Sequence, residues 1–206
     1  MKKALTVLVL VMSIFAASSA FALGNIVLTE PDKTGGPTVL EAIANRKSGI
    51  SFVDTKEIPL KALSTILWAA TGKNREPKGW TVPFAKGVEP YASIYVINNQ
   101  GAFLYSWEKH QLELINEDSK IVKRVVAQPG FENVPLVLVF TTKGAGPVIE
   151  GRAEIAVGAM AQNVYLATQS YGLKARFMQS FNKIVLAQGI NLGPLSRVIG
   201  VMPIGY

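Results

Sequence analysis

The most constraining feature of the sequence is a long helical stretch at residues 149–171 that is apolar on almost every side. Its apolar residues recur at helical spacing and are Ile155, Val157, Met160, Val164, Tyr165 and Leu166. A helix that is apolar all round is normally buried, so we predict a central helix against which the other elements pack. Because one chain of this size cannot easily cover such a helix, we also expect a homodimer.

The rest of the pattern predicts strands and shorter helices around this stretch. Residues 136–140, LVLVF, are apolar without alternation, which indicates a strand buried on both faces. Two strands at 93–97 and 102–107 read as a hairpin. Further strands are expected at 175–179 and 197–201, and helices at 37–44, 59–71, 118–127 and 183–188. This order predicts an α+β fold with a mixed or antiparallel central sheet flanked by helices, in a single domain over 23–206.

The first 22 residues have the composition of a secretory signal peptide. Two lysines precede a charge-free apolar run, and the small residues Ala20 and Ala22 form a cleavage site. We therefore expect a periplasmic or secreted protein that begins near Leu23 and has no stable membrane insertion after cleavage. An uncleaved membrane anchor is the alternative, because the apolar run is long enough to span a bilayer.

Composition excludes several kinds of site. The chain has no cysteine, so it has neither a disulfide nor a thiol nucleophile, and without a His or Cys cluster we expect no metal site. The single histidine, His110, lies in the polar stretch EKHQ, where we expect a solvated side chain. The net charge of +7 suits an anionic ligand, but its cations form no basic stripe, so we expect no nucleic-acid partner. No residue stands out as a catalytic acid or base, and an enzyme built on this chain would depend on a cofactor.

The octapeptide NRKSGISF at residues 45–52 has two explanations. Arg46 and Lys47 follow a short predicted helix, and cations with a following glycine are typical of a helix C-terminus. Two cations beside the Ser48 hydroxyl are also the groups that a phosphate binds.

Five segments together resemble the nitroreductase family, in the branch that includes the thiazoline- and oxazoline-oxidising dehydrogenases. LSTILWAATG at 63–72 is similar to the family's LLWAAxG helix, and NRKSGISF lies upstream, where the family has an Arg-Arg-Ser-x-Arg element. TVPFAKGVEPYASIYVI resembles the family's TVPSAGALYPLEIYVV. GAMAQNVYLATQSYGLKARF resembles its central helix, and VIGVMPIGY resembles its closing strand VIPVGYP.

The resemblance implies an FMN-dependent oxidoreductase that forms an intertwined homodimer with flavin at the subunit interface. The positions matching the family's phosphate-binding element are Arg46, Lys47 and Ser48. Those matching the segments near the flavin ring are Pro83, Phe84, Ala85 and Ser180. Two positions depart from the family: Ile50 stands where a second phosphate-binding arginine is found, and Phe84 replaces a serine.

These observations predict an FMN-dependent oxidoreductase acting outside the cytoplasm on a small electrophile or oxidisable substrate. Neither the substrate nor the electron donor can be named from the sequence. The departures at Ile50 and Phe84 leave an alternative, a non-enzymatic ligand-binding module on a degenerate nitroreductase scaffold with weakened or lost FMN. A purely structural dimer is a third interpretation, because the fold alone does not choose between them.

Overall fold

The computed structural model describes residues 24–77, 79–83, 91–126 and 128–206 of the chain. The predicted signal peptide at 1–22 and two predicted site residues, Phe84 and Ala85, lie outside the described residues. In the described part of the chain, no helix combines the length and the apolar character of a membrane span.

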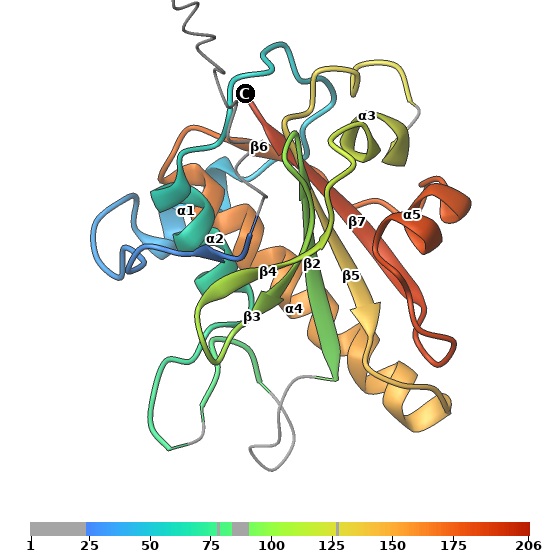
Figure 1. Ribbon diagram of the computed structural model, residues 1–206. Coiled ribbons are helices and arrows are strands. Elements are labelled where there is room, and N and C mark those ends of the chain that lie inside the picture. The colour runs from blue at the N-terminus through green and yellow to red at the C-terminus, as the bar shows by residue number, and fades with distance from the viewer. Residues whose placement is uncertain (1–23, 78, 84–90, 127) are drawn as a thin grey trace, which may run out of the picture.

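A seven-stranded sheet forms the middle of the molecule, and its paired strands run antiparallel (Figure 1). The order across the sheet is β1-β4-β3-β2-β5-β7-β6. The strands are β1 (Ile26–Val27), β2 (Ala92–Asn98), β3 (Gly101–Ser106), β4 (Gln111–Asn116), β5 (Leu136–Thr142), β6 (Lys174–Ala175) and β7 (Val198–Gly205). Of the two arrangements expected from the sequence, the antiparallel one is therefore found.

Helices cover both faces of the sheet and enclose two apolar cores. One face carries α1 (Val39–Asn45), α2 (Leu60–Thr71) and α4 (Pro147–Gln169), and the other carries α3 (Ile121–Val125) and α5 (Lys183–Gly189) (Figure 1). β5 contributes side chains to both cores. Leu138 belongs to the core on the side of α2 and α4, and Val139 belongs to the core on the side of α3 and α5. All seven residues of β5 are buried, which confirms the predicted doubly buried strand.

Local signals explain where several of the helices begin and end. Thr38 and Glu41 form a capping box at the start of α1, in which each side chain accepts a hydrogen bond from the other residue's backbone N–H. Pro59 precedes α2, and Gly72 follows its last residue, as the sequence predicts. Asn182 caps α5 by accepting from the N–H of Val185.

The structure corrects the predicted burial of the long helix. In a single chain α4 buries one side only, through Ala153, Ala156, Val157, Met160, Ala161, Val164, Tyr165 and Thr168. The opposite side is open to solvent, and Ile155 on it is 74% exposed. α4 is therefore a covering helix rather than a central one within this chain.

The strand β4 is absent from the sequence-based prediction. A tight turn precedes it and ends at His110, whose φ of 47° lies in the left-handed region. The expectation of a solvated histidine is wrong, because the His110 ring is half-buried and hydrogen-bonds the hydroxyl of Tyr105 and the carbonyl of Thr29. Two other elements are shorter than predicted: α3 spans five residues, and the strand expected at 175–179 is reduced to β6 and an isolated bridge between Met178 and Val201.

Candidate functional site

The segment after α1 leaves the helix in an extended conformation and lies against β6. Arg46 caps the helix with φ −59° and ψ 124°, and Ser48 forms a parallel bridge with Ala175. The N–H of Gly49 donates to the carbonyl of Ala175 at 2.9 Å. Gly49 does not adopt the left-handed conformation of a C-terminal glycine cap, so the glycine in NRKSGISF has a different role. A Cβ at this position would lie 3.2 Å from the Lys174 side chain, so glycine permits a close approach of the two segments.

Tyr165 of α4 holds two predicted site residues in place. The Arg46 guanidinium lies over the Tyr165 ring, 5.1 Å from its centroid, a distance typical of a cation–π contact. The Ser48 hydroxyl is 3.2 Å from the Tyr165 hydroxyl, which also accepts a hydrogen bond of 2.7 Å from the N–H of Phe177. Tyr165 therefore connects the segment after α1 with the chain that follows β6.

A pocket of about 430 Å³ opens beside this segment. We call it the Lys47–Lys174 pocket; its lining residues are Asn45, Lys47, Ser48, Gly49, Ile50, Ser51, Gln169, Gly172, Leu173 and Lys174. Two ammonium groups and two hydroxyls contribute to the lining, which includes no carboxylate among the described residues. This donor set fits a phosphate or another multivalent oxyanion.

Of the other predicted site residues that the structure describes, Arg46, Pro83 and Ser180 do not line the Lys47–Lys174 pocket. Pro83 is exposed and is the last residue of the described stretch 79–83. Asn163 of α4 holds this stretch in place by donating to the carbonyl of Thr81 at 3.3 Å. Ser180 is also exposed, just beyond the bridge between Met178 and Val201. Phe84 and Ala85 lie outside the described residues, so their predicted positions stay predictions.

The two predicted parts of the site flank one exposed stripe of α4. Tyr165 contacts the segment of Arg46 and Ser48, whereas Asn163 contacts the chain leading to Pro83. Residues two positions apart on a helix point in nearly opposite directions. Around the helix axis, the exposed Ile155 points in a direction between those of Asn163 and Tyr165. The solvent-facing stripe of α4 therefore separates the two parts of the site.

Sequence reasoning missed Tyr165 and Lys174 as site residues. The sequence pattern assigns Tyr165 only to the core and gives Lys174 no role. Ser48 and Tyr165 are 117 positions apart, and only the pairing of the Ser48 segment with β6 brings Lys174 to the pocket. No local pattern in the sequence carries this information. In the described residues no group of three or more metal-ligating side chains comes together.

The comparison with known proteins identifies the fold. The profile of the Nitroreductase family matches residues 43–206 of the chain. A solved structure from Ralstonia eutropha JMP134, assigned as a nitroreductase, is 33% identical with a TM-score of 0.74, and the match covers 89% of each chain. The chain belongs to the nitroreductase family. The resemblance seen in the five sequence segments is thereby confirmed.

Other solved structures share the fold at lower identity. The Escherichia coli microcin synthetase complex McbBCD, solved with truncated pro-MccB17 bound, is 16% identical with a TM-score of 0.69; 87% of this chain and 77% of that chain are covered. A Bacteroides thetaiotaomicron protein assigned as an NADH dehydrogenase/NAD(P)H nitroreductase is 18% identical with a TM-score of 0.57, covering 84% and 88%. A search of the curated proteins finds no match.

Proposed function

We propose that the chain is an FMN-dependent oxidoreductase that acts outside the cytoplasm on a small electrophile or an oxidisable substrate. Membership of the nitroreductase family supports an oxidoreductase function. The observation that carries the choice of FMN is the Lys47–Lys174 pocket, which gathers cations and hydroxyls and, among the described residues, no carboxylate. It lies where the family's phosphate-binding element aligns with Arg46, Lys47 and Ser48.

Each residue of this segment has a distinct role in the proposal. Lys47 and Lys174 provide mobile point charges for a phosphate dianion, and Ser48 provides a hydroxyl donor whose position Tyr165 fixes. Arg46 does not line the pocket; its guanidinium is stacked on the Tyr165 ring, so its side chain is already ordered and would lose little conformational freedom on reaching a phosphate. Gly49 lets the segment approach Lys174 closely.

A bound flavin supplies the hydride or electron-pair chemistry, which the side chains of this protein lack. We expect Pro83, Phe84, Ala85 and Ser180 to lie beside its ring, where they would position it and limit access of water. No general acid or base is proposed, and the catalytic residues stay unknown.

The arrangement around α4 leads us to propose a homodimer. Both parts of the predicted site border the exposed stripe of α4 that carries Ile155. A second copy packed on this stripe would cover the apolar surface and border both parts at once. A site at the subunit interface, composed of groups from both copies, follows from this packing.

The proposal includes export through residues 1–22. Mass spectrometry of the protein recovered from the periplasm or medium should show a chain beginning near Leu23. An intact Met1 terminus on membrane-bound protein would instead support the anchor.

The test of the cofactor is direct. Protein purified anaerobically with added FMN should retain a flavin absorbance spectrum after desalting, and its reduced form should be reoxidised by a small electrophile such as a nitroarene. Riboflavin, which lacks the phosphate, should be retained less well. Protein that retains neither would contradict the proposal.

One observation favours the alternative, a ligand-binding module that has weakened or lost FMN. Ile50 lines the Lys47–Lys174 pocket at the position of a family arginine, and it is 75% exposed. With isoleucine at this position, a bound phosphate would have one charge-assisted contact fewer than in the family. We expect the affinity for FMN to be roughly tenfold lower as a result. Binding of small oxyanions in the pocket without retention of flavin would favour this module over the enzyme.

A further inference from the structure

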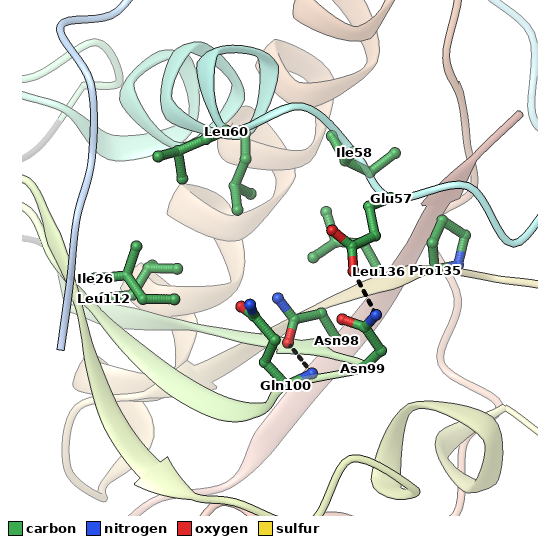
Figure 2. Close-up of a pocket in the computed structure, with 11 residues that line it drawn as sticks. Ile26, Glu57, Ile58, Leu60, Asn98, Asn99, Gln100, Leu112, Pro135 and Leu136 are labelled. Carbon is green, nitrogen blue, oxygen red and sulfur yellow. Dashed lines mark hydrogen bonds between the residues drawn. The ribbon is translucent and has the colours of Figure 1, made fainter. Parts of the chain in front are cut away.

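A second pocket lies beside the start of α2, next to the turn that joins β2 and β3 (Figure 2). Its volume is about 310 Å³, and it shares no lining residue with the Lys47–Lys174 pocket. We call it the turn pocket. A volume of this size lies at the lower end of the range for small-molecule sites, so a ligand in it would be small.

The turn pocket has an apolar floor. Leu63 of α2, Leu112 of β4 and Leu136 of β5 are at most 4% exposed and come from three different elements. Ile26 and Leu60 form its sides, as Figure 2 shows. The floor would accept a short hydrocarbon or aromatic body and remove it from water.

The N-terminal segment completes the wall of this pocket. Ile26 of β1 pairs with Leu112, and the N–H of Leu28 donates to the carbonyl of His110 at 3.1 Å. Leu28 itself is buried in the main core. The wall is thus part of the packed fold rather than a loose strand, and the cavity is formed before any ligand arrives.

The rim of the turn pocket is polar and carries one charge. The Glu57 carboxylate accepts a hydrogen bond of 2.6 Å from Nδ2 of Asn99 (Figure 2). The backbone N–H of Gln100 donates to Oδ1 of Asn98, but the side-chain amide of Gln100 and Nδ2 of Asn98 have no hydrogen-bond partner within the described part of the chain. Among the described residues, no basic side chain lines the pocket, although the whole chain carries a net charge of +7.

We propose that the turn pocket binds a small organic cation, a primary ammonium group on an apolar body. The ammonium would lie beside Glu57 at the rim, where it stays partly hydrated, and amide oxygens of the turn could accept its other N–H groups. The apolar body would enter the floor between Leu63, Leu112 and Leu136. This site is independent of the flavin proposal, because neither its residues nor its chemistry is shared with the Lys47–Lys174 pocket.

Three probes of similar size and different charge test the proposal on the purified protein. They are 2-phenylethylamine, 2-phenylethanol and 3-phenylpropanoate, titrated while the side-chain amide resonances of Asn98, Asn99 and Gln100 are followed by NMR. We expect the ammonium to shift these resonances and to bind about tenfold more tightly than the alcohol, because a charge-assisted contact is the stronger one. The carboxylate should not bind.

Two variants and a matched control locate the interaction. Glu57→Gln should remove the preference for the ammonium and leave the weak binding of the alcohol, whereas Glu108→Gln, an equal charge change at an exposed residue outside the pocket, should change neither. Leu60→Trp, at a partly exposed position beside the cavity, should fill it and abolish binding of both probes.

Thermal unfolding confirms that each variant is folded. Equal affinity for ammonium and alcohol, no binding of the ammonium at millimolar concentration, or equal losses in Glu57→Gln and Glu108→Gln would overturn the proposal.

Discussion

Nε2 of His110 lies 2.7 Å from Oγ of Ser64, so the only histidine of the chain is bonded to the middle of a buried helix face. The same nitrogen is 3.1 Å from the carbonyl oxygen of Thr29, to which Ser64 also donates, and Nδ1 is 2.9 Å from the Tyr105 hydroxyl. A neutral ring with its hydrogen on Nε2 fits these contacts, because that N–H can be shared between Ser64 Oγ and the Thr29 carbonyl while Tyr105 donates to Nδ1. His110 thereby fastens the N-terminal segment to α2 and β3.

Loss of this network should destabilise the fold. His110→Asn keeps a residue that tolerates the left-handed φ of 47° at this position but is too short to reach Ser64. The Tyr105 hydroxyl would then be left without its partner, and we expect the free energy of unfolding in urea to fall by about 1–3 kcal/mol. Lys109→Asn, on the neighbouring exposed residue, should cost less than about 0.5 kcal/mol. Equal effects of the two substitutions would show that the network does not stabilise the fold.

Stability should also depend on pH through His110. Burial lowers the pKa of His110 below its usual value of 6.5; the Glu30 carboxylate opposes the shift, and the Lys33 ammonium reinforces it. The unfolded chain then binds the proton more tightly than the folded one, so stability rises with pH between the two pKa values. The contribution is complete above about pH 6.5 and is lost as the pH falls from there through the lowered folded pKa. Urea midpoints from pH 7.5 to 5 should decline for the wild type and less for His110→Asn; parallel curves would exclude His110 as the cause.

Lys174→Ala should weaken FMN about three- to tenfold and leave riboflavin unchanged, because only FMN carries the phosphate and Lys174 is an exposed cation. Titration by quenching of flavin fluorescence measures both. Lys123→Ala, on an exposed lysine of α3 across the sheet, removes the same charge away from the pocket and should change neither affinity. An equal loss for FMN and riboflavin would mean that Lys174 does not contact the phosphate.

Ile50→Arg should act in the opposite direction. Ile50 is exposed and lines the pocket, so an arginine there can reach a phosphate without disturbing the core. We expect FMN to bind about three- to tenfold more tightly, with no change for riboflavin. Val53→Arg is the matched control, since Val53 is 73% exposed and does not line the pocket. If both substitutions tighten FMN equally, the effect comes from net charge alone.

Ile155→Lys should dissociate the proposed homodimer. Ile155 is 74% exposed on the open stripe of α4, where a second copy would bury it. Burial of an unpaired ammonium in an apolar contact is strongly unfavourable. Ile184→Lys on α5 is the control, because Ile184 is 71% exposed on the opposite face of the sheet. Sedimentation velocity should give a monomer for the first variant and a dimer for the second; a monomeric wild type at micromolar concentration would contradict the proposal.

The sequence predicts those elements whose signals lie within them. The unbroken apolar run of β5 and the residues Pro59 and Gly72 around α2 are local features, and each predicts its element correctly. β4 was missed because it begins directly after a residue with positive φ and carries polar residues on its partly exposed face. Its pairing with β3 and β1 stabilises it, and that pairing is a property of the sheet.

The residues of the candidate site, too, can be predicted from the sequence only where their signal is local. Lys47 and Ser48 were found because their motif is contiguous, whereas Lys174 and Tyr165 reach it only through contacts between distant segments. The burial of α4 was predicted wrongly for a related reason. An apolar sequence indicates which residues favour burial, but the surface that covers Ile155 does not have to belong to the same chain.

The strands at the two margins of the sheet, β1 and β6, contain two residues each. Such short margins offer few free backbone N–H and C=O groups, and the Ser48 segment already occupies part of the outer side of β6. A second sheet therefore cannot extend this one strand by strand, and edge-to-edge aggregation is disfavoured. We therefore expect the proposed homodimer to form through the helical surface, where contacts between side chains can select one partner orientation.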